Sequence, residues 1–321
     1  MHRRSLLAAP ALLATPALAQ PWAPARAITM TVPFAAGGSP DVLARLMAPH
    51  AQGLLGQPVQ VENRTGAGAI VGAQHVLRQP ADGHSVLVAP IGALTGPLMV
   101  PNAPFDPMRD FRHVVPLAIT PTVLVVRPGF PANTVAEWHR AVQAARPGTY
   151  SYASGGVGNP AHLAAELYRA MTGADITHIP FRGSGAAVPE LLAGRVDFAI
   201  IDLPTVAPMI AARELRGLAV GTAERIAALP DLPTMAESIL PGFEAYSWVM
   251  WWVPTATPAP VAARLNEVGN AVIRQPDVIA RAAQAGFVLT GGTEADAARH
   301  MQAEHARWSR VIRERGIRLD S

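Results

Sequence analysis

The sequence contains neither cysteine nor lysine, and all 26 basic residues are arginine. Without cysteine there is no disulfide bond, no iron–sulfur cluster, no thiol nucleophile and no lipidated N-terminal cysteine. Without lysine there is no Schiff-base lysine, no lysine-anchored pyridoxal phosphate and no Walker lysine. These absences exclude several classes of enzyme. They also mean that the hydrophobic core has to stabilise the fold without disulfide cross-links.

Long apolar runs are missing as well, and no segment is long enough to span a bilayer. The apolar run at residues 6–18 follows Arg3 and Arg4 and ends in small residues before Gln20. This pattern predicts a cleaved signal peptide at residues 1–19, using the Sec or the twin-arginine route. Roughly 300 residues remain after cleavage, enough for two domains and a core that needs no disulfides. We expect a periplasmic protein that is not embedded in the membrane.

The charge pattern does not indicate a nucleic-acid partner. The formal net charge of +3 includes two arginines of the predicted signal peptide, so the cleaved chain is almost neutral. Arginines are scattered, except in the last predicted helix: Arg307, Arg310, Arg313, Arg315 and Arg318. We interpret that helix face as solvated, with docking to a membrane partner as the alternative, and we expect no nucleic-acid binding.

Strand-like and helix-like segments alternate along the whole chain, which predicts an α/β fold with parallel strand pairing. Strands are expected at residues 28–34, 59–62, 85–89, 123–126, 150–153, 176–179, 196–201, 215–220, 247–253 and 287–289. Thr134 with Glu137, and Thr293 with Asp296, predict helix starts, and Gly316 predicts a helix end. No linker or tandem repeat divides the chain.

The first predicted strand runs into a loop of small residues that favours an anion. That loop consists of Ala35, Ala36, Gly37 and Gly38. The helix that follows is expected to open with Ser39 as its N-cap, Pro40 at its first position and Asp41 in its first turn. Small residues let the backbone approach a guest closely, and the free N–H groups and dipole of a helix start favour a negative group.

Glycine-rich turns recur after three later strands. Residues 66–72 read G-x-G-x-x-x-G, one residue off the dinucleotide fingerprint, and the next strand lacks the acidic residue that would bind a ribose. We interpret this segment as a tight turn or a carboxylate-facing loop, and we expect no cofactor. Residues 154–162 are the stronger candidate for ligand contact, because Asn159 caps a helix with Pro160 at its first position.

Two further positions have alternative interpretations. Arg182, before Gly183 and Ser184, either clamps a carboxylate or lies on the surface. Ser184 is not in a G-x-S-x-G elbow, so the turn gives no support to a hydrolase. Asp202 ends an apolar strand, where its carboxylate either bonds an amino or hydroxyl group of a ligand or caps the next helix.

Histidine spacing gives no metal site. His300 and Glu304 lie one helical turn apart with His305 adjacent, one residue off a zinc-hydrolase motif. We interpret this as a solvated helix face and expect neither a metal nor a catalytic residue. Trp248, Trp251 and Trp252 occupy both faces of one predicted strand, which indicates a buried central strand, with Trp248 reaching the cleft as the alternative.

Read in order, these segments resemble the substrate-binding proteins of tripartite tricarboxylate transporters, the Bug/TctC family. The resemblance covers essentially the whole cleaved chain. It rests on VPFAAGGSPDVLAR (32–45), GQPVQVENRTGAGAIVGA (56–73), YASGGVGNPAHLAAEL (150–167), HIPFRGSGAAVPELLAGRVDFAIIDLP (178–204) and PGFEAYSWVMWWVPTATP (241–258).

The resemblance implies a type II-like periplasmic binding fold, with two α/β domains, a hinge and a ligand cleft. It implies a small organic acid as ligand, transporter membrane subunits as partners, and a monomer. The domains would be residues 20–122 plus 248–321, and 123–247. Ligand contacts would fall on Phe34, Ala35, Ala36, Gly37, Gly38, Ser39, Asp41, Gly68, Ala69, Ile70, Ser154, Gly155, Asn159, His162, Gly183, Ser184 and Asp202.

This chain departs from the family pattern at Pro40 and at the apolar segment 90–93. These departures favour a less polar or smaller acid as the ligand.

Two other functions stay open from the sequence. One is an exported receptor that reports ligand occupancy to a sensor kinase, and the other is an exported hydrolase, for which no motif supplies a nucleophile and base.

Overall fold

The computed structural model describes residues 22–181 and 183–319. The predicted signal peptide and its cleavage site lie outside this part of the chain, as does Arg182. Among the described residues, no helix combines the length and apolar character needed to cross a bilayer.

The strands form one mixed sheet. Its order is β2 (Val59–Asn63), β1 (Ile28–Val32), β3 (Ser85–Pro90), β9 (Tyr246–Pro254), β4 (Phe111–Val126), β7 (Phe198–Asp202), β5 (Ser151–Ser154) and β6 (Thr177–Pro180), while β8 (Arg216–Val220) and β10 (Val288–Leu289) pair with β4. Each predicted strand is present. The predicted parallel pairing is confirmed only toward the two ends of the sheet, because β4 and β9 pair antiparallel with their neighbours at its centre.

Residues 111–122 were not predicted as strand, yet they form most of β4. Pro116 and Pro121 interrupt the segment, and a proline normally argues against a central strand because it cannot donate to the ladder. Here the pairing of β4 with β9 shifts register beside Pro116, and this irregularity accommodates the proline.

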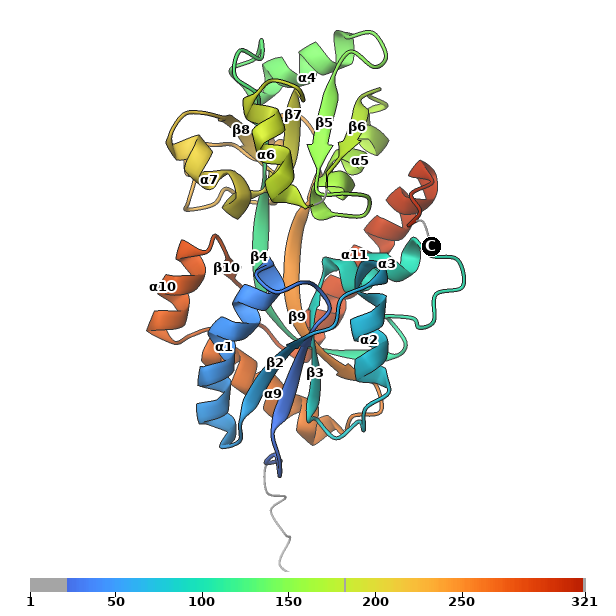
Figure 1. Cartoon of the computed structure of the whole chain (residues 1–321), viewed down its shortest axis with the longest axis vertical. Coiled ribbons are helices and arrows are strands. Elements are labelled where there is room, and N and C mark those ends of the chain that lie inside the picture. The colour runs from blue at the N-terminus through green and yellow to red at the C-terminus, as the bar shows by residue number, and fades with distance from the viewer. Residues whose placement is uncertain (1–21, 182, 320–321) are drawn as a thin grey trace, which may run out of the picture.

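The molecule has two lobes, and β4 and β9 run between them (Figure 1). Helices of the lower lobe are α1 (Ser39–Leu55), α2 (Ile70–Leu77), α3 (Ile91–Leu98), α9 (Ala259–Val272), α10 (Pro276–Gln284) and α11 (Glu294–Arg315), with the short 3-10 turn η1 (Ala67–Ala69). Helices of the upper lobe are α4 (Val135–Ala144), α5 (Pro160–Thr172), α6 (Ser184–Leu192), α7 (Leu203–Ala211) and α8 (Met235–Ser238).

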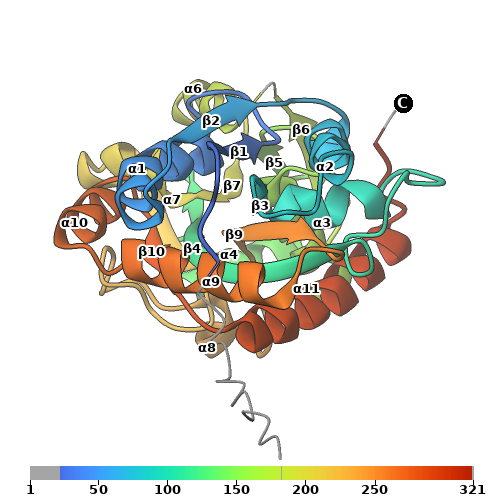
Figure 2. The same ribbon diagram turned by 90° about the horizontal axis from the view of Figure 1, so that it is seen from below.

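Strand β9 is buried on both faces, as its tryptophans indicated. Trp251 packs in one apolar cluster with α1, α9 and α10, and Trp252 packs in another with α2, α3 and α11. Figure 2 shows these helices surrounding the strands of the lower lobe. Trp248 does not reach a cleft: it is 1% exposed, and its indole N–H donates to Glu304 at 2.8 Å.

The prediction of a solvated face on the last helix is wrong for Glu304. Its side chain is buried, and its carboxylate also accepts from the indole of Trp308 at 3.0 Å and from Arg307 at 2.7 Å. The reason is that α11 lays this face against β4 and the other elements of the same apolar cluster. The predicted helix start at Thr293 to Asp296 and the helix end at Gly316 are confirmed, and Thr293 and Asp296 form a capping box there.

Candidate functional site

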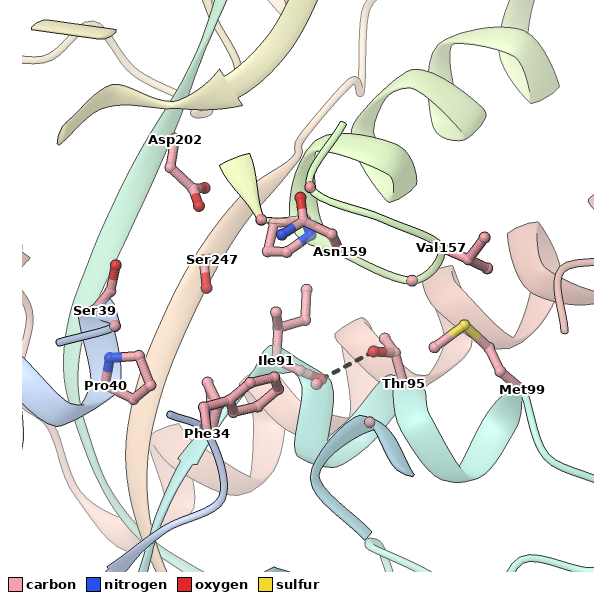
Figure 3. A pocket seen from close by; sticks show the side chains of 18 of the residues that line it. Phe34, Ser39, Pro40, Ile91, Thr95, Met99, Val157, Asn159, Asp202 and Ser247 are labelled. Carbon is pink, nitrogen blue, oxygen red and sulfur yellow. Dashed lines mark hydrogen bonds between the residues drawn. The ribbon is translucent and has the colours of Figure 1, made fainter. Parts of the chain in front are cut away.

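A cavity of about 380 Å³ lies between the two lobes, in the size range of small-molecule sites (Figure 3). It is lined by Phe34, Gly38, Ser39, Pro40, Gly68, Pro90, Ile91, Gly92, Thr95, Met99, Gly155, Val157, Gly158, Asn159, Pro160, Gly183, Asp202, Ser247 and Leu319. The lining combines both lobes, the start of β9 and the C-terminal tail, so the cavity depends on the relative position of the lobes.

Helix starts converge on this cavity. For each of the helices α1, α3, α5, α6 and α7, the lining includes either the first helical residue or the residue just before it. The first N–H groups of a helix have no partner inside the helix, and the helix dipole places partial positive charge there. With α1 and α3 from one lobe and α5, α6 and α7 from the other, the cavity is suited to an anion held from both sides.

The loop before α1 is organised by Asp41, which does not line the cavity. This carboxylate is 2% exposed and accepts from the N–H of Gly37 at 2.9 Å, from Arg45 at 3.0 Å and from Asn63 at 2.9 Å. Burial alone raises the pKa of Asp41, but these hydrogen bonds outweigh burial and hold its pKa below the ordinary value. Asp41 therefore fixes the loop shape and leaves Gly38 and Ser39 to face the cavity.

The predicted N-cap of α1 is wrong by one residue. Gly38 occupies the cap position with extended backbone, no side chain caps the helix, and Ser39 is already helical. Asp41 in the first turn accepts instead from the N–H of Gly37, which precedes the cap residue, so it organises the loop and does not cap the helix. Residues 35–37 form the outer part of this loop and are not among the lining residues.

The turn at residues 66–69 runs through consecutive positive φ angles, including 45° at Ala67 and 81° at Ala69. Alanine rarely adopts this conformation, so the surroundings have to enforce it. Helix α3 does so by close approach, because a Cβ on Gly96 would lie 2.1 Å from the carbonyl oxygen of Gly68. Of this turn Gly68 lines the cavity, while Ala69 and Ile70 are buried in the core.

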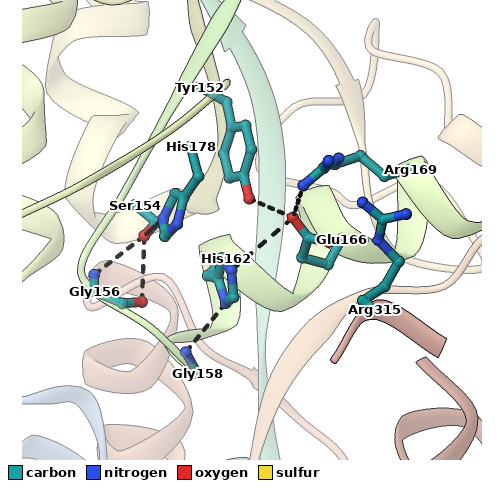
Figure 4. Close-up of polar contacts among 9 residues, drawn as sticks. All are labelled: Tyr152, Ser154, Gly156, Gly158, His162, Glu166, Arg169, His178 and Arg315. Atoms are coloured by element: carbon teal, nitrogen blue, oxygen red, sulfur yellow. Dashed lines mark hydrogen bonds and ion pairs between the residues drawn. The ribbon is translucent and has the colours of Figure 1, made fainter. Parts of the chain in front are cut away.

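Two histidines that do not line the cavity form hydrogen bonds with the loop before α5 (Figure 4). The hydroxyl of Ser154 bonds His178 at 2.7 Å, and the N–H of Gly158 donates to Nδ1 of His162 at 3.1 Å. Asn159 is the N-cap, as predicted, and accepts from the N–H of Ala161 at 2.9 Å. Ser154 and His162 are buried supports that do not line the cavity.

The turn before α6 packs directly on the loop before α5. A Cβ on Gly155 would lie 2.7 Å from the backbone nitrogen of Ser184, so only glycine permits this contact. Gly155 and Gly183 line the cavity, and Ser184 does not. At these two glycines, a ligand would therefore contact backbone atoms.

Asp202 ends β7 and precedes α7, where it makes no capping hydrogen bond. Its side chain points into the cavity near Ser39 and Ser247 (Figure 3). The Oδ1 atom is shielded from solvent and has no hydrogen-bond partner, and burial raises the pKa of Asp202 to about 7. Of the two interpretations of this residue, the structure favours the one in which its carboxyl faces the cavity.

Several lining residues were not predicted as contacts. Ile91, Thr95 and Met99 belong to α3 or follow it, and that helix contains Gly96 and Pro97, which obscure a helical pattern. Ser247 lies in a strand read as buried core, and Leu319 carries no local signal at all. The apolar character of residues 90–93 was the one available sign that this segment faces the ligand.

The described residues include no group of three or more His, Asp or Glu side chains arranged to hold a metal ion. The only ionisable side chain among the cavity-lining residues given above is Asp202.

Comparison with known proteins gives a consistent result. A family model described as "Tripartite tricarboxylate transporter family receptor" matches residues 43–317. "Protein BugT" of Bordetella pertussis is 36% identical over 298 residues, covering 92% of this chain and 91% of that protein.

Two solved structures share the fold over almost their whole length. "R. palustris Rpa4515 with adipate" has a TM-score of 0.79 and 35% identity, covering 92% of this chain and 99% of that one. "MatC (Rpa3494) from Rhodopseudomonas palustris with bound malate" has a TM-score of 0.76 and 30% identity, covering 90% and 99%.

Proposed function

The chain belongs to the tripartite tricarboxylate transporter receptor family, the Bug/TctC periplasmic solute-binding proteins, and on this premise we propose that its cavity holds the carboxylate of a small organic acid. The observation that carries this proposal is the convergence of helix starts from both lobes on one cavity. Backbone N–H groups of these helix starts would bind the carboxylate, as they bind anions generally.

We propose that binding works by domain closure and involves no catalysis. The two domains are residues 20–122 with 248–321, and residues 123–247, and they hinge where β4 and β9 cross between the lobes. At that crossing the Thr122 hydroxyl donates to the carbonyl oxygen of Ala245 at 2.5 Å. A ligand that touches both lobes stabilises the closed form, which the membrane subunits of the transporter then recognise in a monomeric receptor.

A panel of organic acids tests the proposal by thermal unfolding and calorimetry of the purified protein. An acid that binds only the folded protein stabilises it by about 2.7 kcal/mol at a free concentration of 100 Kd. Val157→Trp should block the cavity and weaken binding by about tenfold or more, since the new ring competes for the ligand's volume. Val288→Trp is the matched control, because both valines are more than 40% exposed and Val288 lies in β10, outside the lining. A panel in which no acid binds would contradict the proposal.

Export through an N-terminal signal is part of the same proposal. Expression of the full-length chain in a Gram-negative host should deliver a shortened protein to the periplasmic fraction, with a new N-terminus at Gln20. Retention of the full-length chain in the cytoplasm would argue against export.

A further inference from the structure

The cavity has two chemically different ends. Ser39, Ser247 and the carboxyl of Asp202 gather at one end, whereas Val157 and Met99 lie at the other (Figure 3). An acid that enters this cavity therefore meets polar groups at one end and apolar side chains at the other.

The C-terminal tail completes the apolar end. After α11 the chain turns at Gly316, whose φ is 61°, and the N–H of Leu319 donates to the carbonyl oxygen of Met99 at 3.1 Å. A Cβ built on Gly68 would lie 2.7 Å from one methyl of Leu319, and a Cβ built on Gly158 would lie 3.6 Å from the other. The Leu319 side chain thus sits between a turn of the lower lobe and a loop of the upper lobe.

An ion pair anchors this tail to the upper lobe (Figure 4). Arg315, in the last turn of α11, donates to Glu166 of α5 at 2.8 Å. Glu166 is 3% exposed and also accepts from the Tyr152 hydroxyl at 2.7 Å and from Arg169 at 2.6 Å. The tail that carries Leu319 is therefore held on both sides of the cleft.

Three hydrogen-bond donors near the apolar end are already occupied. The Thr95 hydroxyl donates to the carbonyl oxygen of Ile91 at 3.2 Å, and the N–H of Gly158 donates to His162. The N–H of Leu319 is taken by Met99. A second carboxylate placed here would lose its hydration without gaining these donors, which is unfavourable, whereas a methyl or aromatic group would be buried favourably.

We propose that the ligand is an organic acid whose end opposite the bound carboxylate is apolar, and that Leu319 is a specificity-determining residue that selects it together with Met99. This inference rests on the proposed function and narrows it. It separates this chain from receptors for acids that are charged at both ends.

Matched pairs of acids test the inference by calorimetry at constant pH and salt. Each pair has a straight-chain monocarboxylate and the dicarboxylate of the same carbon count, from butanoate with succinate to octanoate with suberate. The monocarboxylate of the best-binding pair is expected to bind at least about tenfold tighter. If dicarboxylates bind as tightly or more tightly, the inference about the apolar end fails alone. If no acid of either kind binds, the proposed function fails with it.

A variant at the tail tests the residue itself. Leu319→Arg places a cation at the apolar end and is expected to shift the ratio of affinities at least about tenfold toward the dicarboxylate. Leu54→Arg is the matched control, because Leu54 is 38% exposed on α1 and does not line the cavity, so it should leave the ratio unchanged. Thermal unfolding verifies that both variants are folded. An unchanged ratio in folded Leu319→Arg would overturn the role given to Leu319.

Discussion

The starts of α1 and α7 each carry an aspartate, and the two differ in almost every physical respect. Asp41, in the lower lobe, is surrounded by donors from Gly37, Arg45 and Asn63. Asp202, in the upper lobe, has one carboxyl oxygen buried without a partner and faces the cavity. The pKa of Asp41 is lowered by its hydrogen bonds against the effect of burial, and the pKa of Asp202 is raised by burial.

We infer from this contrast that Asp41 is a structural carboxylate and that Asp202 is the one available to a ligand. Satisfying every lone pair of Asp41 shapes a loop, and such a residue has no capacity left for a guest. Leaving Asp202 unsatisfied costs stability when the carboxyl is ionised, which is the arrangement expected where a ligand supplies the missing partner. An aspartate at a helix start therefore stabilises a loop in one lobe and stays available to a ligand in the other.

The largest expected effect comes from removing the structural carboxylate. Asp41→Ala leaves the Gly37 N–H, Asn63 and Arg45 without their acceptor and should lower the free energy of unfolding by about 2 kcal/mol. Urea denaturation measures this. Asp231→Ala, at an exposed position, should stay within about 0.5 kcal/mol of the parent protein. If both substitutions changed the free energy of unfolding by the same amount, the structural role assigned to Asp41 would be wrong.

A smaller effect is expected on ligand affinity at the functional carboxylate. Below its pKa of about 7, Asp202 is protonated and can donate to a carboxylate ligand, and above that value its charge repels the ligand. Affinity for a monocarboxylate should therefore fall by about tenfold between pH 6 and pH 8. Calorimetry at both pH values checks this. Asp202→Asn keeps a donor at every pH, so it should show no such fall, and a fall as steep as in the parent protein would contradict the assignment.

The smallest effect is expected on the stability of the unliganded protein. The folded-state pKa of Asp202 lies above the unfolded value of 3.8, so the folded protein binds the proton more tightly. Stability from this residue is present below pH 3.8 and is lost as the pH rises toward 7. Asp202→Asn removes this penalty and should therefore raise the melting temperature by about 2 °C or more at pH 8 and by less at pH 5. A variant that is less stable at pH 8 would show that the carboxylate has a stabilising partner.

The same two aspartates show what the sequence could and could not predict. Both positions are visible as acids at strand–helix boundaries, and the family resemblance placed both among the ligand contacts. The distinction between them depends on Asn63, which donates to Asp41 from β2, and on the burial of Asp202 Oδ1 without any such donor. Such contacts are set by tertiary packing and leave no local trace.

Backbone elements were predicted better than long-range geometry. The parallel strands and their glycine turns follow from local pattern, whereas most of β4 was not predicted, and its prolines Pro116 and Pro121 are residues that normally argue against a central strand. The apolar end of the cavity was missed for a different reason. Leu319 reaches it only because α11 carries the tail back across both lobes, which no short window of sequence reveals.

The position of β9 constrains the order in which the chain can fold. This strand lies between β3 and β4, so the sheet of the lower lobe has a gap until residues 246–254 are available. The chain of the upper lobe between β4 and β9 is available before that point, and it is closed by the contact between Thr122 and Ala245. During synthesis from the N-terminus, the upper lobe is therefore able to fold first. The lower lobe contains the N-terminal strands, but it cannot complete its sheet until the last quarter of the chain has been made.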